Sequence, residues 1–510
     1  FRQETNNEIL LTANRTFMQD FSLNVSGGAN QRINSFDLKE AGSRKLNVPG
    51  IYNVSNTAAP PLINNIVQEK RVNSLYGLMT IGFREFAFID VTARNDWSST
   101  LPEDNRSYFY PSFSGSLVFT DALNMRSDFL SFGKLRASWA KVGNDADPYQ
   151  LTSVYSEVDK YGNIPGFTTS NTIPNSGLRP EETLSWEIGT DLRFWFDRAT
   201  LDLTYYNATT KDQILAVDVS ETSGYTSQVL NAGEVQNKGI EALLNFTVLQ
   251  QTDGLTWDLT TNFSKNDSKV ISLAPGLESI RIGRGGGIRG GVEARPGQPY
   301  GIFWGPDWER SASGQPIVGS NGLPIRGSSK VLGDYQPDWV AGLRSTLSYG
   351  AFTFTTQADT RRGGYIFCGS CRLGYRTGVT IESGNRPAGG VIFDGVTEGG
   401  SANAVGVDPR TLAKRLDDVD TEWLYENNFT KLREVAVGFD LPAHYLGNLP
   451  VSQARFTIVG RNLWLWTDVP HIDPETAYID GSPSESNLAG IEYEQFPTAR
   501  TFGINISLVH

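Results

Sequence analysis

The chain has 510 residues, and 44 lysine and arginine residues against 56 aspartate and glutamate residues give it a formal net charge of −12. Hydrophobic residues make up 39% and charged residues 20%, which excludes a disordered chain and a bundle of membrane-spanning helices. No run rich in lysine or arginine is present, so we expect no nucleic-acid partner.

The N-terminus does not resemble a targeting segment. Phe1 is followed by polar residues, with no apolar stretch and no cleavage site of the kind found in signal peptides. No apolar stretch reaches the ~18 residues that a membrane-spanning helix requires. Because Phe1 is not a natural start residue, we expect an interior fragment or a processed chain.

Alternation of apolar and polar residues with period 2 recurs along the whole chain and predicts about fifteen strands. Many of them exceed the ~9–11 residues that a tilted strand needs to cross a membrane. The predicted ranges are 7–17, 19–36, 72–84, 86–97, 108–123, 130–143, 184–196, 198–219, 230–250, 255–273, 336–350, 351–364, 424–442, 451–467 and 497–510.

The connections between these strands alternate in length. Short turns are predicted at 18–19, 84–85, 197–198, 251–254, 349–351 and 443–450. Long connections are predicted at 37–71, 144–183, 274–335, 365–423 and 468–496. Outer-membrane barrels are sorted in this way, with tight periplasmic turns and long external loops. The alternative is a large secreted all-β protein, either an enzyme or an adhesin, which has no cause to sort its loops.

The strand count also predicts how the chain begins. With the C-terminus on the periplasmic side, the first of fifteen strands enters from the external face. A closed barrel with an even total number of strands then needs an odd number of further strands before Phe1, in addition to these fifteen. Direct pairing of 7–17 with 497–510 would refute this prediction.

Polar residues on the strands are expected to face a wet interior, where they line a route and bind an internal plug. This set is Glu187, Asp191, Arg193, Asp202, Asp258 and Arg344. Aromatic residues near strand ends fit two interfacial girdles as well as they fit an ordinary core. These are Trp195, Phe196 and Tyr349 beside short turns, and Trp464 and Trp466 at the other end of their strand.

Two motifs in the long connections are weak. The glycine run 283–291 matches G-x-G-x-x-G, but no strand-then-helix unit surrounds it, so we expect a mobile external loop rather than a phosphate site. Further on, Trp304 and Trp308, with Arg310 nearby, could stack on a sugar or peptide ligand. We predict these three residues as substrate-binding.

Cysteine and acidic residues complete the candidates. Cys368 and Cys371 form a lone C-x-x-C, which we interpret as a local disulfide pinning a loop tip, with free thiols as the alternative. Three histidines are too scattered to complete a zinc site, so neither a metal nor a cofactor is expected. The acidic clusters 417–420 and 473–475 lack EF-hand spacing, and solvated loop charge is favoured over calcium.

Six paired segments in chain order resemble the SusC/RagA-like TonB-dependent outer-membrane transporters. They are RNDWSS at 94–99 with YPSFS at 110–114, KLRASW at 134–139 with GN at 143–144, LRPE at 178–181 with WEIG at 186–189, NAG at 231–233 with NKGIE at 237–241, LR at 432–433 with GFDLP at 438–442, and GRNLW at 460–464 with DPE at 473–475. Each segment alone is weak, and the six together carry the resemblance. The chain ends in His510, whereas the family usually ends in an aromatic residue.

The resemblance implies an all-β fold, a transmembrane antiparallel barrel of 22 strands of which residues 1–510 are the C-terminal portion. The plug, the TonB box and the first seven strands would precede Phe1. It further implies import of oligosaccharides or peptides across the outer membrane of a Gram-negative bacterium. TonB would drive the import, a SusD-like surface lipoprotein would act as a lid, and no enzyme activity is expected. The alternative function is a structural or assembly role in a larger outer-membrane complex.

Overall fold

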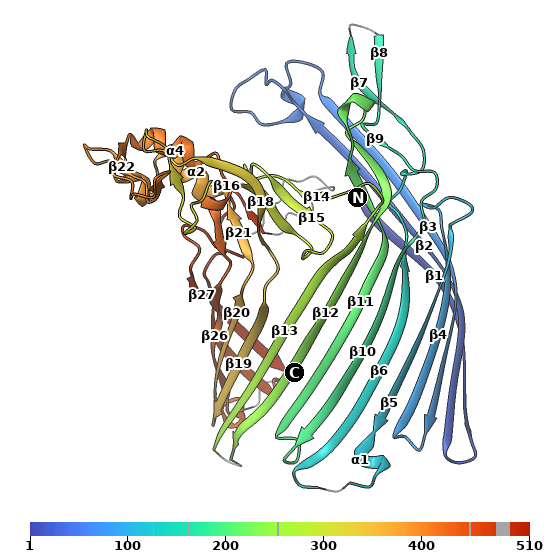
Figure 1. Cartoon of the computed structure of the whole chain (residues 1–510). Coiled ribbons are helices and arrows are strands. Elements are labelled where there is room, and N and C mark those ends of the chain that lie inside the picture. The colour runs from blue at the N-terminus through green and yellow to red at the C-terminus, as the bar shows by residue number, and fades with distance from the viewer. Residues whose placement is uncertain (126, 162–163, 252–253, 448–449, 476–489, 510) are drawn as a thin grey trace. The chain divides into compact units, whose positions relative to one another are not determined.

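The computed structural model describes residues 1–125, 127–161, 164–251, 254–447, 450–475 and 490–509. Antiparallel strands dominate it (Figure 1). Among these residues, no helix combines the length and the apolar composition that crossing a membrane would take.

Fifteen of the described strands follow one another in the main sheet, and β9 (Thr172–Ile173) pairs with β12. In hydrogen-bonded order they are β1 (Arg2–Phe17), β2 (Phe21–Gly42), β3 (Leu62–Phe83), β4 (Ala87–Ser98), β5 (Ser107–Val118), β6 (Leu130–Asn144), β10 (Glu181–Phe194), β11 (Ala199–Asp218), β12 (Ser227–Gln250), β13 (Leu255–Leu273), β19 (Trp339–Tyr349), β20 (Phe352–Arg362), β26 (Phe429–Leu441), β27 (Gln453–Thr467) and β29 (Thr501–Val509). Each predicted strand corresponds to one of these. The prediction of an all-β antiparallel fold is therefore confirmed.

Several predicted boundaries are wrong. β3 begins at Leu62 instead of 72, because residues 62–71 pair with residues 33–42 at the far end of β2. The short helix α1 (Phe119–Ala122) replaces the end of the strand predicted at 108–123. The strand predicted at 424–442 is two strands, β25 (Leu424–Glu426) and β26. β1 and β29 are first and last in the sheet order, and the prediction of further strands before Phe1 stays a prediction.

The tight turns have a backbone geometry that closes hairpins. Met18 and Gln19 have φ of 52° and 61°, and Arg84 and Glu85 have φ of 47° and 61°. Two consecutive residues with positive φ form the turn whose twist matches that of paired strands. The predicted short connections at 18–19 and 84–85 are thus confirmed.

The described chain divides into two units, each taken by itself below. The first comprises Phe1–Val118, Arg136–Trp186 and Ala208–Glu234. Its strand register sorts side chains by face, because successive residues of a strand point to opposite sides. One row that crosses β1 to β5 is apolar: Ala13, Val25, Met79, Val91 and Phe113. The adjacent row is polar: Asn14, Asn24, Thr80, Asp90 and Ser114.

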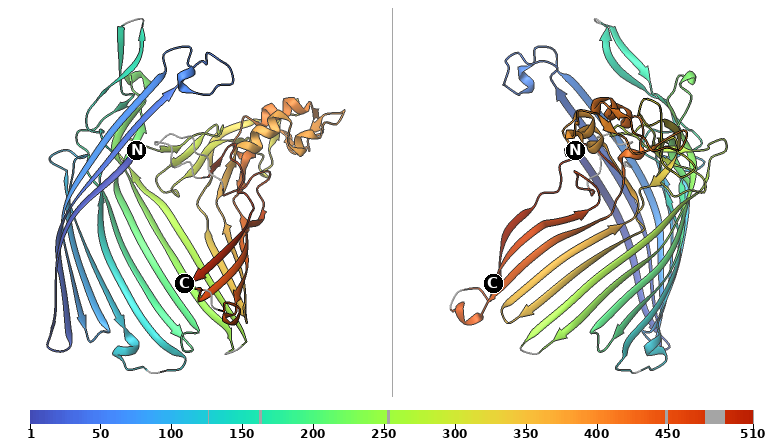
Figure 2. Two further views of the ribbon diagram at one scale, coloured as in Figure 1. Left: turned by 180° about the vertical axis from the view of Figure 1, so that it is seen from behind. Right: turned by 60° about the vertical axis from the view of Figure 1, so that its left-hand side comes forward.

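The second unit comprises Phe119–Leu135, Glu187–Asn207 and Val235–His510. The same sorting crosses β13, β19, β20, β26, β27 and β29, which lie side by side in Figure 2. One row is apolar: Trp257, Leu347, Phe354, Val437, Ile458 and Ile504. Another is polar: Thr260, Arg344, Gln357, Glu434, Arg461 and Thr501.

Aromatic rings lie at both ends of the apolar face of the second unit. Beside the turn at Gly350, Tyr349 pairs with Phe352, whose ring lies 5.0 Å from that of Phe439. At the opposite end, the rings of Trp464 and Trp466 stack 6.2 Å apart. This placement has the geometry of the two girdles that the sequence suggested.

The long connections contain structure of their own. In the first unit they hold η1 (Val54–Asn56), the hairpin of β7 (Tyr155–Tyr161) and β8 (Ile164–Thr169), and η2 (Glu221–Ser223). In the second unit they hold β14 (Ile280–Gly283), β15 (Gly291–Ala294), β16 (Ile302–Trp308), β17 (Ile317–Val318), β18 (Arg326–Asp334), β21 (Tyr365–Cys368), α2 (Gly369–Thr377), α3 (Ile381–Gly384), β22 (Val391–Ile392), β23 (Val396–Thr397), β24 (Gly406–Val407), α4 (Pro409–Leu416), η3 (Thr421–Trp423), β25 and β28 (Ile491–Glu492). A last short turn, η4 (Ala443–Tyr445), follows β26.

Candidate functional site

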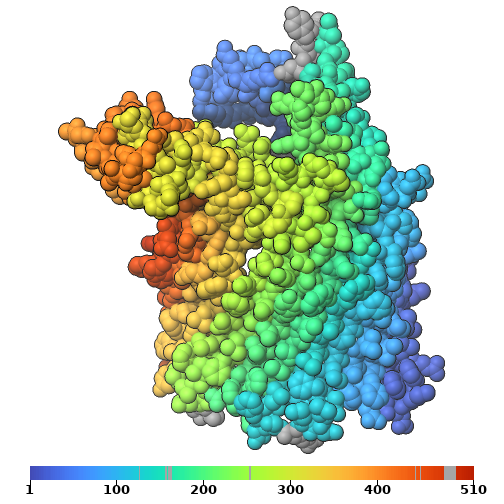
Figure 3. Space-filling model, in the orientation of Figure 1, coloured from blue at the N-terminus to red at the C-terminus, as the bar shows by residue number. Residues whose placement is uncertain are grey.

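The long connections of the second unit fold into one packed body, residues 280–334, 365–426 and 490–492, which we call the loop module. Figure 3 shows its yellow and orange residues massed together. Its core draws on every one of these segments: Ile288, Val292, Phe303, Trp308, Phe367, Cys368, Cys371, Val407, Leu412, Leu416, Val419, Trp423 and Ile491. A core of this kind fixes the side chains at the module's surface.

A buried carboxylate, Asp420, holds the glycine run in place. Its side chain is 1% exposed and accepts hydrogen bonds from the backbone N–H groups of Arg289 (2.7 Å) and Gly290 (2.8 Å). Gly290 has no room for a side chain, since a Cβ there would lie 1.7 Å from the carbonyl oxygen of Trp304. Burial raises the pKa of Asp420, and the two N–H donors oppose that shift. The prediction that 283–291 is a mobile loop is therefore wrong.

Asp417 is buried too and lies among arginines. Its carboxylate accepts a 2.6 Å hydrogen bond from Arg289 and lies 2.8 Å from Nε of Arg372 and 3.5 Å from Nη1 of Arg376. The contact with Arg372 is an ion pair without hydrogen-bond alignment. Solvated charge, the interpretation favoured for 417–420, is wrong for Asp417 and Asp420, because both carboxylates anchor backbone and guanidinium groups. Asp418 remains about two-fifths exposed.

Cys368 and Cys371 form a disulfide with their Cα atoms 5.2 Å apart. The predicted bond is confirmed, but its predicted place at a loop tip is wrong. Both residues are almost fully buried at the junction of β21 and α2, in the module's core.

The three predicted substrate-binding residues lie on or beside β16. Trp308 is 3% exposed, its indole N–H donates to Glu422, and its ring meets Phe393 edge-on. Trp304 is half-buried under the guanidinium of Arg295, 3.6 Å from the ring centroid. Their contacts give Trp308 a packing role and leave part of Trp304 accessible. Ligand binding by either ring stays a prediction.

Arg310 makes a two-pronged contact with Asp307, at 2.9 and 3.0 Å, and Lys330 reaches the same carboxylate at 2.6 Å. Burial alone would raise the pKa of Asp307, but hydrogen bonds from Arg310 and Lys330 outweigh it and hold that pKa well below its usual range. The guanidinium of Arg310 is therefore committed to the module's own structure. Its predicted role in ligand binding stays a prediction.

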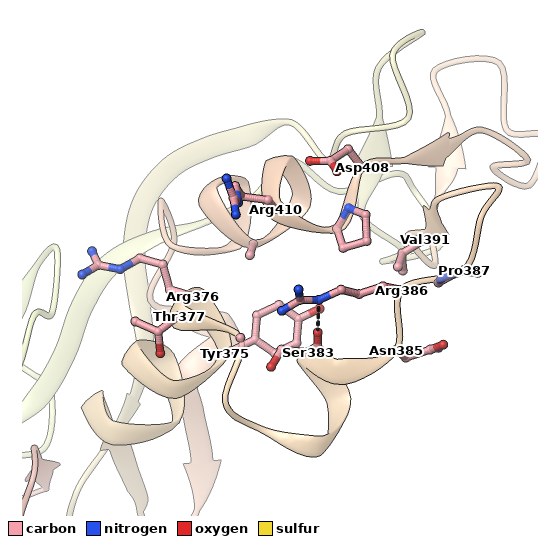
Figure 4. A pocket seen from close by; sticks show the side chains of 13 residues that line it. Tyr375, Arg376, Thr377, Ser383, Asn385, Arg386, Pro387, Val391, Asp408 and Arg410 are labelled. Carbon is pink, nitrogen blue, oxygen red and sulfur yellow. Dashed lines mark hydrogen bonds between the residues drawn. The ribbon is translucent and has the colours of Figure 1, made fainter.

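A pocket of about 450 Å³ lies between α2, α3 and α4 (Figure 4). Three guanidinium groups line it, those of Arg376, Arg386 and Arg410, against one carboxylate, Asp408, which caps α4. Arg386 donates to the carbonyl oxygen of Ser383 at 3.3 Å. An excess of guanidinium in one pocket is suited to carboxylate- or sulfate-bearing groups.

A second pocket of about 300 Å³ is aromatic and acidic. Tyr375, Trp423 and Tyr425 line it with Glu422 and His471. Burial raises the pKa of Tyr425 to about 12, and the charge of Glu422 adds to that shift. Burial likewise raises the pKa of Glu422 itself. Aromatic faces beside hydrogen-bonding groups are a common surface for sugar rings and apolar side chains.

Below the module, Asp473 and Glu475 clamp the start of the last long connection onto β26. Lys431, 2% exposed, lies 2.7 Å from Asp473 and 2.6 Å from Glu475. Arg433 bridges Glu475 and Asp359. Burial by itself would raise the pKa of Asp473. The hydrogen bond from Lys431 outweighs this effect, so the pKa of Asp473 lies below its ordinary value. The solvated-charge interpretation is wrong here as well. Among the residues that the structure describes, no cluster of three or more metal-ligating side chains occurs.

Six polar strand residues were predicted to face a wet interior, and four of them form a hydrogen bond or line a common hollow. Asp191, Arg193 and Asp202 line one hollow of about 360 Å³ with Lys134. Asp258 accepts a 2.7 Å hydrogen bond from Thr247. Arg344 lies in the polar row described above, and Glu187 is exposed on β10.

Sequence reasoning missed the arginine pocket and the Lys431 clamp. Arg376, Arg386 and Arg410 are spread over a connection, 365–423, that holds six basic residues against eight acidic ones, so no local excess of charge marked the pocket. No local signal marks Lys431 either, because its partners Asp473 and Glu475 follow 42 and 44 residues later.

Comparison with known proteins decides the family. Residues 2–385 match the family model described as TonB dependent receptor-like, beta-barrel. The chain belongs to this family. The predicted transmembrane β-barrel fold and the SusC/RagA-like resemblance are thereby confirmed. Proteins of this kind are outer-membrane proteins of Gram-negative bacteria.

Curated relatives match most or all of the chain. TonB-dependent receptor P3 of Formosa agariphila is 26% identical over 100% of this chain and 52% of its own length. TonB-dependent receptor SusC of Bacteroides thetaiotaomicron is 23% identical over 85% of this chain and 43% of its own length. The chain thus spans about half the length of the curated relatives it matches.

Among solved structures, that of the RagAB peptide transporter superposes with a TM-score of 0.79 at 19% identity. The match covers 99% of this chain and 55% of the other. At this identity the likeness shows a shared fold.

Proposed function

We propose that the full-length protein containing this chain imports oligosaccharides or peptides across the outer membrane of a Gram-negative bacterium, with energy delivered by TonB. The observation that carries the proposal is the family match over residues 2–385. The alternation of polar and apolar rows supports it, since a transporting barrel needs one face for lipid and one for a wet interior.

We propose that the loop module receives the substrate. Trp304 offers a partly accessible ring beside Arg295, and the arginine pocket and the aromatic pocket lie in the same body. Trp304, Trp308 and Arg310 remain the residues proposed for binding, with Trp308 and Arg310 acting through the shape of the module because their side chains are already bonded. The similarity to SusC and to the RagAB peptide transporter supports nutrient import but does not choose between glycan and peptide.

A SusD-like surface lipoprotein is the proposed lid and would meet the ends of the long connections. Residues 1–510 as the C-terminal portion of a 22-stranded barrel also remain a prediction. The residues preceding Phe1 in the full-length protein test it, because they should contain seven strands and a compact plug.

Uptake by living cells tests the function. Deletion of the full-length gene, of the gene for the SusD-like lipoprotein or of TonB should each abolish uptake of one labelled oligosaccharide or peptide pool. Restored expression should recover it. Unchanged uptake after all three deletions would contradict the proposal. Loss of outer-membrane complexes with uptake intact would favour a structural or assembly role.

A further inference from the structure

The first unit has an outward, apolar face on β1 to β5. The rows that contain Phe17 and Ala13 belong to it, and so does the row that contains Ile9, because these residues are an even number of positions apart on β1. From Phe17 to Ile9 the strand rises about 27 Å at about 3.4 Å per residue. A tilt of about 40° reduces this to about 21 Å, close to the ~25 Å apolar band of outer-membrane barrels. The row of Ile9 is thus the upper border of the band, at the end opposite the Met18 turn.

The next row on this face is rich in amides. Asn7 pairs with Gln31, Gln31 with Asn73, and Asn73 with Trp97. Gln31 donates to the side-chain oxygen of Asn73 at 3.0 Å, which aligns the two amides along the sheet. Amides present both donors and acceptors to whatever lies beside them.

A hollow of about 580 Å³ opens where these two rows meet. Ala29 forms its floor, because its small side chain lies between Ile9 and Leu75 in the register. Ile9 is 70% and Leu75 56% exposed, so both walls present apolar surface. Gln31 and Trp97 line the polar side. The hollow is therefore apolar toward the membrane core and amide-lined toward the outside.

Glu8 is the one charged residue among the described residues that line the hollow. Among the described residues that line it there is no lysine or arginine. Arg71, on the row above, lies 3.3 Å from Glu69 on the same strand. Glu8 lies on the opposite face, where the hydroxyl of Tyr76 donates to it. A phosphate headgroup would find no cation in this lining, whereas sugar hydroxyl and amide groups would find matching donors and acceptors.

We propose that this hollow binds one saccharide-headed lipid of the outer leaflet, with an acyl chain against Ile9 and Leu75 and a sugar against Gln31, Asn73 and Trp97. The site is separate from the loop module and does not depend on import. A bound lipid would fix the depth of the sheet in the membrane through hydrogen bonds at the band's upper border.

The test uses the full-length protein purified from its outer membrane in mild detergent, with dephosphorylated lipopolysaccharide truncated to its core sugars as the probe. Native mass spectrometry counts the bound lipid. The double variant Gln31→Leu with Asn73→Leu should bind at least tenfold less tightly, since two or more hydrogen bonds are lost. Asn65→Leu is the matched control, because Asn65 is an exposed amide on the same strand and the same face, outside the hollow. It should bind as the wild type does.

Two further probes define the ligand. Phosphatidylethanolamine and the deacylated core oligosaccharide should each bind at least tenfold more weakly than the intact lipid. Equal retention of lipopolysaccharide by the double variant would overturn the site, and equal binding of phosphatidylethanolamine would overturn its saccharide preference. Heat-modifiable gel mobility shows whether the double variant has folded. If it has not, Ala29→Phe replaces it, because this change fills the hollow and removes no polar group. It should bind the lipid at least tenfold less tightly, and unchanged binding would overturn the site.

Discussion

The main sheet and the loop module of the second unit use apolar residues in opposite ways. In the sheet, Ile458 and Ile504 are 64% and 75% exposed, although they belong to a continuous apolar row. In the module, Phe303 and Phe367 are fully buried within a core of their own. The sheet therefore needs lipid to complete its burial, whereas the module is folded like a water-soluble domain and is held by buried ion pairs. The variants below separate the two, from the largest expected effect to the smallest.

Trp308→Ala should cost the loop module about 3–5 kcal/mol, the usual loss for a large buried aromatic side chain. Hydrogen–deuterium exchange should show faster exchange in β16 and η3, with β19 and β20 unchanged. Trp304→Ala is the control, because that ring is only half-buried and should cost less. Equal protection of the module in wild type and Trp308→Ala would contradict the packing role.

Asp420→Ala should cost about 3 kcal/mol, because it leaves the buried N–H groups of Arg289 and Gly290 without acceptors. Limited proteolysis should then cut within 284–290, which the wild type protects. Asp418→Ala, two residues away but more exposed, should leave the pattern of fragments unchanged. Cleavage at 284–290 in the wild type would restore the mobile-loop prediction.

Leu343→Lys should destabilise the sheet by about 2–4 kcal/mol, the cost of a cation on the lipid face near mid-membrane. Thr346→Lys lies on the opposite, polar face of the same strand and should cost little. Unfolding of each variant in liposomes by urea gives both numbers. Equal costs for the two variants would mean that the faces do not differ in environment.

Lowering the pH should destabilise the module around Asp307 only slightly, and only under strongly acidic conditions. The folded pKa of this group lies below the ordinary value of 3.8. Its stabilising contribution is therefore complete above that value and declines as the pH falls through the lower, folded pKa. Exchange in β16 should rise below pH ~4 in the wild type, whereas Asp307→Asn should show the faster exchange at neutral pH as well. A rise that begins near neutrality would implicate another group.

The sequence predicts the main sheet better than it predicts the contacts of the loop module. Alternation on one strand is enough to place Phe502, Ile504, Ile506 and Leu508 on one face, because lipid and water impose a period of two. Asp420 and its two N–H donors are about 130 residues apart, so no local pattern could reveal that contact. Trp308 illustrates the limit at a candidate site, since a surface ligand contact and a buried packing role have the same local sequence.

Accessibility along β19 tests the central claim most directly. Single cysteines would be placed at positions 343 to 348 of the full-length protein in native outer membranes. Each would be tested for reaction with a water-soluble maleimide and, after attachment of a spin label, for contact of that label with oxygen dissolved in the lipid. Positions 343, 345 and 347 should resist maleimide and sense oxygen, while 344, 346 and 348 should do the reverse. Uniform maleimide labelling at all six positions would contradict a lipid-facing sheet.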